Sequence, residues 1–144
     1  MKEENKISHT FLACSTCIIV FLIMIYFVVP MADKLLTWFG VLFVPERYGG
    51  GEAAKNPGLI QLLFHGVVQN AISAYCAITA GTAFFHQSNK KMVAIIFGIF
   101  ISFGAIIFTY VIFRSDGFFI ALAIPITMSP ALYFTNQLWK EGNS

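Results

Sequence analysis

The stretch at residues 59–85, LIQLLFHGVVQNAISAYCAITAGTAFF, decides the fold, because polar residues recur at helical spacing inside an otherwise apolar run. At about 100° per residue, these polar residues fall on one face of an α-helix and apolar residues cover the opposite face. The polar residues are Gln61, His65, Gln69, Ser73 and Cys76. The apolar residues are Ile60, Phe64, Val67, Ala71, Tyr75 and Ile78. We expect such a helix to turn its apolar face to lipid and its polar face to protein or water.

The composition is that of a membrane protein. Of the 144 residues, 58% are hydrophobic, 16% are aromatic and 11% are charged, whereas about a quarter of the residues in soluble domains carry a charge. The net charge of +2 is too small to indicate a nucleic-acid-binding surface. The three cysteines all lie in apolar segments, so the sequence does not suggest the disulfide framework of a secreted protein.

Four apolar runs can each cross a bilayer as a helix, since about twenty helical residues span a hydrocarbon core ~30 Å thick. The predicted spans cover residues 10–31, 59–85, 92–113 and 118–138, within one transmembrane domain at residues 1–144. A flexible polar tail at residues 1–9 precedes the first span, and Pro30 is expected to end it. A cleaved signal peptide is the alternative, but this run exceeds the usual signal-peptide core of ~7–15 residues. The sequence therefore predicts an all-α, integral membrane four-helix bundle.

The segment between the first two spans is apolar at residues 35–44 but too short to cross a bilayer. Trp38 and Phe39 are typical interfacial anchors, so we expect a short interfacial helix there. The glycine triplet at residues 49–51 lacks the strand and the Lys or Ser that accompany a phosphate-binding loop. A flexible loop is the better prediction.

Small residues line one edge of the second and third predicted spans. These residues are Gly66, Asn70, Ala77 and Gly81 in the second span, and Ala94, Gly98, Ser102 and Ala105 in the third. Small residues let two helix backbones approach closely in lipid. We therefore expect the second and third spans, joined by a short turn, to be a close pair.

The fourth span contains Pro125 and Pro130, which remove two backbone hydrogen-bond donors. We expect a kink or local unwinding of the helix at these prolines. Thr127 and Ser129 are placed to donate to the carbonyls that the prolines leave without a partner.

The orientation follows from the lysine and arginine residues. Four spans place both termini on one side, together with the turn after the second span. That side carries five cations, Lys2, Lys6, Lys90, Lys91 and Lys140, and the other carries four, Lys34, Arg47, Lys55 and Arg114. The positive-inside rule predicts cytoplasmic termini.

The first candidate site is a ligand-binding wall on the second span. Its predicted residues are Gln61, His65, Gln69 and Ser73, with Arg114 closing the pocket at the end of the third span. Such a pocket, between the second, third and fourth spans, would bind a hydrophobic small molecule, a lipid or a partner helix. The alternatives are hydrogen bonds between helices and, for Arg114, a simple end of the helix. A further alternative is an accessory subunit of a larger membrane complex, and the expected protein partners are a second copy of the chain or other subunits of such a complex. We assign no catalytic residue and no cofactor.

The second candidate site is a set of thiols. Cys14 and Cys17 lie three residues apart on one face of the first span, and Cys76 falls at a comparable depth on the second. Thiols at this spacing can form a redox couple or bind a soft metal such as mercury. The alternative is that they are small buried residues of the core.

The order of spans resembles that of DoxX-like small four-helix membrane proteins. The features that carry the resemblance are the interfacial segment after the first span, the short basic turn, and the Asp116–Gly117 turn before the fourth span. The resemblance covers residues 10–138 and implies architecture rather than activity. The Cys14 and Cys17 pair is similar to that of small mercury-uptake proteins of the mer type.

Overall fold

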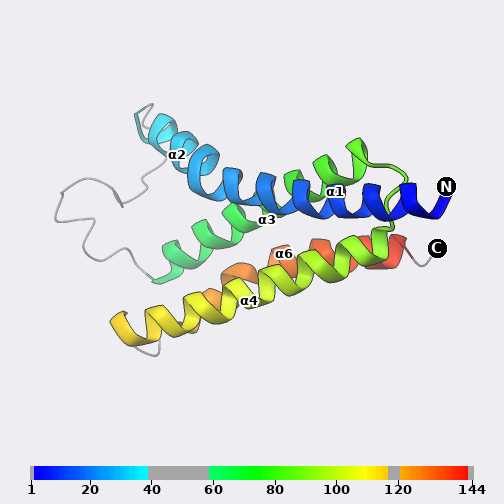
Figure 1. Ribbon diagram of the computed structural model, residues 1–144. Coiled ribbons are helices and arrows are strands. Elements are labelled where there is room, and N and C mark those ends of the chain that lie inside the picture. Colours follow the sequence, from blue (N-terminus) through cyan, green and yellow to red (C-terminus); the bar gives the residue numbers. More distant parts are fainter. Residues whose placement is uncertain (1, 39–58, 117–120, 143–144) are drawn as a thin grey trace.

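The computed structural model of the protein describes residues 2–38, 59–116 and 121–142. In these residues the regular structure is helical, with no strand, as the sequence predicts (Figure 1). The elements are α1 (Lys2–Ile23), the π-helix η1 (Met24–Val28), α2 (Val29–Trp38), α3 (Leu59–Phe84), α4 (Lys90–Asp116) and α6 (Ala123–Glu141). The predictions for residues 39–44 and 49–51 lie outside the described residues.

The N-terminal tail is helical from Lys2 onward, so the prediction of a flexible tail at residues 1–9 is wrong. The first turns of α1 pack on the turn that follows α3, and this contact stabilises them. His9 lies edge-on to Phe85 with ring centroids 6.0 Å apart, and the Asn89 N–H donates to Thr10 Oγ1 at 2.9 Å.

The first helix also continues past Pro30, where the sequence predicts its end. The chain passes from α1 through η1 into α2 without leaving the helical conformation. Val29 donates its N–H to the carbonyl of Met24, five residues earlier, instead of to the carbonyl four residues earlier. This wider π turn directly precedes the proline, which has no N–H and would clash in a regular α-helix.

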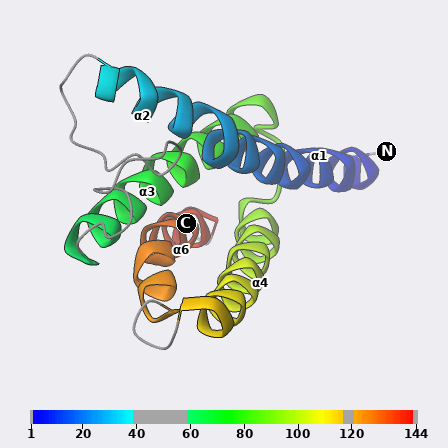
Figure 2. The ribbon, with the colours of Figure 1, turned by 90° about the vertical axis from the view of Figure 1, so that its left-hand side faces the viewer.

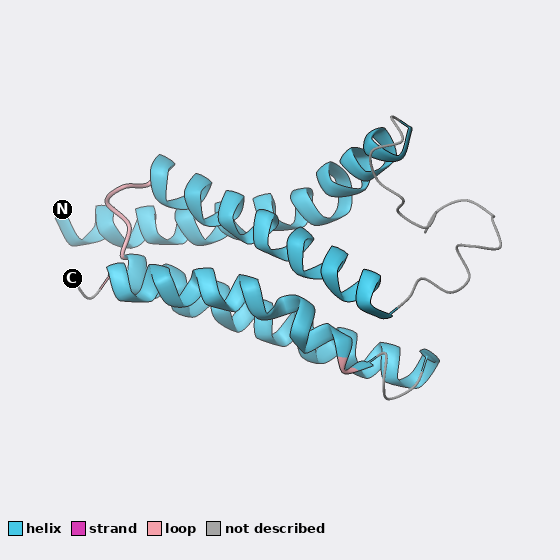
Figure 3. Cartoon of the chain, turned by 180° about the vertical axis from the view of Figure 1, so that it is seen from behind, coloured by secondary structure: helices cyan, strands magenta, loops and turns pink. Residues whose placement is uncertain are grey.

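The helices form two layers, α1 beside α3 and α4 beside α6 (Figures 1 and 3). Across the layers α3 packs on α6 and α4 packs on α1, so α3 and α4 lie diagonally opposite (Figure 2). The prediction that these two helices form a close pair is therefore wrong. The short turn between them places them antiparallel but does not make them neighbours.

The small residues do mediate close helix approaches, but with other partners. A Cβ atom on Gly66 would lie 2.5 Å from Cγ2 of Thr127 on α6. A Cβ atom on Gly81 would meet Sγ of Cys17 and the carbonyl oxygen of Ala13 on α1, the latter at 2.9 Å. Because these contacts face α6 and α1, they leave no edge of α3 for α4.

The core lies between the four long helices and is built largely of small and aromatic side chains. Its buried members include Ala13, Cys17, Phe21, Ala74, Ala77, Val93, Phe97, Ile101 and Ala131. Phe21 of α1 packs edge-on against Phe97 of α4, with centroids 5.5 Å apart. This pair joins the two layers.

The outer surface is apolar as well. Large side chains such as Phe27, Phe103, Ile106 and Tyr133 are each more than half exposed. Two helical stretches, Asn5–Ala32 and Lys90–Arg114, are long and apolar enough to cross a membrane. An apolar exterior around an apolar core is typical of a helix bundle in lipid.

The last helix, α6, begins at Ala123, and the predicted start of the span at residue 118 lies outside the described residues. Pro125 therefore lies in its first turn, where helical N–H groups have no partner within the helix. Pro130 lies inside the helix and α6 continues through it without unwinding, whereas a turn at Leu122 interrupts the helical conformation just before Pro125.

The hydrogen bonds that replace the missing proline N–H groups in α6 agree with the sequence prediction in part. Pro130 leaves the carbonyl of Ile126 without its backbone donor, and Ser129 Oγ donates to that carbonyl at 2.7 Å. The prediction for Ser129 is confirmed. Thr127 Oγ1 instead donates to the carbonyl of Ile124 at 2.9 Å, which is not a carbonyl that either proline leaves unpaired.

The helix approach at Gly81 gives a test of this packing. We expect Gly81→Ala to lower the free energy of unfolding by about 1–3 kcal/mol, because the added methyl must displace the α1 backbone. Gly104→Ala is the matched control, since a Cβ there meets nothing within 4 Å and alanine favours the helix. Thermal unfolding of both variants in the same detergent measures the difference, and equal midpoints would contradict the packing.

Candidate functional site

Gln69 makes the hydrogen bond that connects α3 to the π turn. The carbonyl of Ile25 has no helical donor, because Val29 donates to Met24 instead and Pro30 has no N–H. Gln69 Nε2 lies 3.4 Å from this carbonyl oxygen and donates to it. For Gln69, the structure therefore has the interhelical hydrogen bond that the sequence allows as the alternative to a ligand contact.

The predicted wall on α3 is not assembled as one surface by the described side chains. Ser73 is fully buried, whereas Arg114 is exposed and stacks over Tyr110 at 6.0 Å. The side chains of Gln61 and His65 lie outside the described residues.

The buried stripe of α3 is rotated away from the Gln and His positions. It runs through Asn70, Ser73, Ala74, Ala77 and Gly81, while Gln69 and Cys76 lie at its flank, half-buried. Sequence periodicity predicts which residues of α3 share a polar face, but it does not predict which face packs on the neighbouring helices. The buried stripe follows the small residues, because these permit the closest approach.

Two polar atoms on this stripe are buried without a hydrogen-bond partner, Asn70 Oδ1 and Ser73 Oγ. The amide of Asn70 uses its other end, since Nδ2 donates to the carbonyl of Gly66 at 2.9 Å. Both side chains face the interior of the bundle and are closed off from its surface.

The three cysteines are not gathered into one cluster. Cys14 and Cys17 are buried in the core and Cys76 is half-buried. Cys17 packs where Gly81 lets α3 approach α1. In the described parts of the chain, no three His, Cys, Asp or Glu side chains lie close enough together to hold a metal ion.

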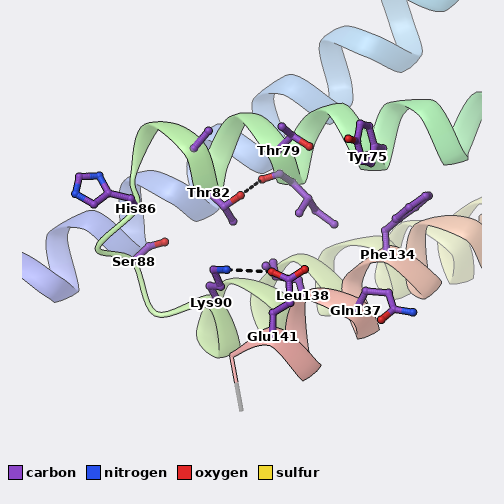
Figure 4. A pocket seen from close by; sticks show the side chains of 12 residues that line it. Tyr75, Thr79, Thr82, His86, Ser88, Lys90, Phe134, Gln137, Leu138 and Glu141 are labelled. Carbon is purple, nitrogen blue, oxygen red and sulfur yellow. Dashed lines mark hydrogen bonds and ion pairs between the residues drawn. The ribbon is translucent and has the colours of Figure 1, made fainter. Parts of the chain in front are cut away.

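A groove of about 440 Å³ opens between α3 and α6, at the end of the bundle that carries both chain termini (Figure 4). Its apolar lining consists of Tyr75, Ile78, Ala83, Phe134 and Leu138. Its polar lining consists of Thr79, Thr82, His86, Ser88, Lys90, Gln137 and Glu141. None of the predicted wall residues lines it.

The groove has an apolar inner end and a charged mouth. Tyr75 and Phe134 face each other at the inner end, with centroids 5.8 Å apart. At the mouth, Lys90 Nζ lies 3.0 Å from Glu141 Oε2 (Figure 4). The hydroxyl of Thr82 donates to the carbonyl of Ile78 at 2.8 Å. The methyl group of Thr82 is therefore the part that can contact a ligand.

Hydrogen bonds between side chains and backbone N–H groups hold the start of α4 at the mouth in place. Asn89 Oδ1 accepts the N–H of Met92 at 3.3 Å, which makes Asn89 the N-cap of α4. The Asn89 N–H donates in turn to Thr10 of α1. At the other side, Gly142 lies directly against the Lys91 backbone, and a Cβ there would be 2.8 Å from Lys91 N. The ends of α4 and α6 are therefore fixed next to each other.

The spacing of the lining residues along the sequence is a signal for this groove. Residues 75, 79 and 82 on α3 and residues 134, 137, 138 and 141 on α6 follow helical spacing, and both sets mix aromatic and polar types. The two stripes become one site only when α3 and α6 are known to be neighbours.

A second groove, of about 500 Å³, lies between α1 and α4 at the same end. Its lining is apolar except for Lys6, Thr10 and Asn89. Two of these polar residues already serve the bond between Thr10 and Asn89. The groove between α3 and α6 is therefore the better candidate for binding a ligand.

Comparison of the chain with protein families, with curated proteins and with solved structures gives no match. The functional argument therefore depends on the geometry of the groove.

The bond between Gln69 and Ile25 can be tested by a double-mutant cycle. We expect Gln69→Leu to lower the free energy of unfolding by about 0.5–1.5 kcal/mol, because it leaves the carbonyl without a donor. Pro30→Ala restores a backbone N–H, so the same change should cost less in that background. The measurement is unfolding in detergent, with Gln87→Leu in the exposed turn as the control. The same cost in both backgrounds would contradict this role of Gln69.

Proposed function

We propose that the protein is a four-span membrane bundle that binds an amphipathic molecule, such as a lipid, in the groove between α3 and α6. The observation that carries the proposal is the polarity of this groove, apolar at Tyr75 and Phe134 and charged at Lys90 and Glu141. Ligand pockets are typically apolar clefts of ~300–1,000 Å³ with a few polar groups that orient the ligand. A groove of about 440 Å³ falls in this range.

Membrane insertion of all four long helices is supported by the apolar surface of the bundle. Two of the helices are apolar enough by themselves. The remaining two, α3 and α6, contain more polar residues, but several of these are buried in the bundle, including Asn70, Ser73, Thr127 and Thr135. In lipid, such polar residues are expected toward neighbouring helices.

The proposed orientation places the groove mouth toward the cytoplasm. The termini and the turn between α3 and α4 lie at one end of the bundle (Figure 1). By the positive-inside rule, the lysines of this end favour the cytoplasmic side. The assignment to the DoxX-like proteins stays a prediction.

The groove belongs to the three helices named by the sequence prediction, since α3, α4 and α6 correspond to the second, third and fourth spans. It lies at the opposite end of the bundle from the start of α3 and from the end of α4 (Figure 1), whose last turn contains Arg114. The proposal therefore keeps the predicted ligand class and changes the residues that bind it.

Filling the groove tests the function. We expect Thr79→Trp to reduce the lipid retained by the purified protein, because the indole occupies the space between α3 and α6. Ile72→Trp is the matched control, since Ile72 is exposed on the same helix and does not line the groove. Native mass spectrometry from a mild detergent measures the retained mass.

Equal lipid retention by the two variants would contradict the proposal. A protein of defined mass that is lost only from Thr79→Trp would instead support the alternative of a partner helix in the groove.

A further inference from the structure

We propose that the groove selects a membrane phospholipid whose headgroup is zwitterionic. Its phosphate binds Lys90 and its ammonium binds Glu141. This inference rests on the lipid-binding function proposed above and names the lipid class. The observations that carry it are the opposite charges at the mouth, their fixed position, and the depth at which they lie.

The two charges at the mouth lie in contact and remain accessible. Lys90 Nζ is 3.0 Å from Glu141 Oε2, and the side chains are 43% and 61% exposed. An ion pair in such an exposed place contributes little to stability. A ligand that brings one negative and one positive group can therefore replace the contact between Lys90 and Glu141, because it offers an oppositely charged group to each side chain.

The two helix ends that carry this pair are held together by backbone contacts. Lys90 is the first residue of α4 and Glu141 is the last of α6. The Asn89 cap and the contact of Gly142 with Lys91 keep these helix ends together. A preorganised pair of charges binds a matching ligand with a smaller loss of conformational entropy.

Charge complementarity distinguishes between classes of lipid. An anionic headgroup would pair with Lys90 but would place its net negative charge beside Glu141. A cationic amphiphile would have the converse conflict with Lys90. A zwitterion satisfies both groups, and like charges placed together are a general source of discrimination against other ligands. Ser88 and Gln137, which also line the mouth, can donate to phosphate oxygens.

The depth of the mouth favours a lipid of the bilayer over a soluble zwitterion. Lys91 Nζ lies 4.5 Å from the ring centroid of Trp139 at the same end of the bundle. Tryptophan and lysine together are typical of the membrane interface. A phospholipid at this level has its headgroup beside Lys90 and its acyl chains beside Tyr75 and Phe134, farther into the apolar layer.

The test uses the full-length protein in detergent with an equimolar mixture of phosphatidylethanolamine and phosphatidylglycerol that have the same acyl chains. Native mass spectrometry gives the ratio of the two bound lipids. We expect the wild type to favour phosphatidylethanolamine. Glu141→Gln should lower this ratio by about two- to fivefold, the size expected for one exposed charge pair. Lys90→Gln should reduce the total phospholipid bound and raise the ratio, since Glu141 then repels the anionic lipid.

Lys91→Gln is the matched control, because Lys91 lies at the same helix end but over Trp139. If Glu141→Gln and Lys90→Gln change the ratio no more than Lys91→Gln does, the inference about the headgroup is wrong. The proposed function would still stand if Thr79→Trp released both lipids. If Thr79→Trp released neither lipid, the proposed function itself would fail. Thermal unfolding of each variant verifies that the fold is retained.

Discussion

The hydrogen bond from Gln69 Nε2 to the carbonyl of Ile25 is the interaction on which the arrangement of the first two long helices depends. In lipid, a backbone carbonyl without a donor is costly, because no water is present to replace it. Pro30 creates such a carbonyl, and the donor comes from α3 at 3.4 Å. The rod α1–η1–α2 remains helical through the proline, and α3 lies beside it where a donor is needed.

The contrast with α6 explains why one proline ties two helices together and the other does not. At Pro130, the carbonyl of Ile126 receives a hydrogen bond from Ser129 of the same helix at 2.7 Å. The hydroxyl of Ser129, next to the proline, therefore supplies the missing donor within the same helix. The π turn before Pro30 has no such residue, since its sequence is MIYFV, so a long amide side chain must come from a neighbouring helix. A carbonyl left without a backbone donor by proline is thus satisfied by a neighbouring helix near Pro30 and by the same helix near Pro130.

Local rules in the sequence predicted the helical class, the helix around residues 59–85 and the role of Ser129, because each depends on neighbours along the chain. The predicted helix end at Pro30 is wrong because the compensating donor, Gln69, lies 44 positions along the chain from the Ile25 carbonyl to which it donates. The pairing of α3 with α4 was misjudged for a similar reason. Gly66 and Gly81 indicate close approach, but only the shapes of Thr127 and Cys17 decide which helix approaches. The groove was missed because its lining comes from three helices.

The positions of Gly66 and Gly81 also explain why a groove can exist between α3 and α6. Near Gly66, α3 is in close contact with α6 through Thr127, whereas at Gly81 its close contact is with α1 through Cys17 and Ala13. Meanwhile Gly98 admits Thr135, with a Cβ there 3.2 Å from its Cγ2, and so holds α6 against α4. Toward the termini, α3 therefore packs closely on α1, whereas α6 packs closely on α4.

The polar residues of α3 fall into two groups along the helix. Those along the bundle interior and beside η1, such as Gln69 and Asn70, bond to backbone carbonyls, and those beyond Tyr75 line the opening. Gln69 thereby joins α3 to η1, whereas Thr79 and Thr82 line the groove, where the Thr82 hydroxyl donates to the carbonyl of Ile78.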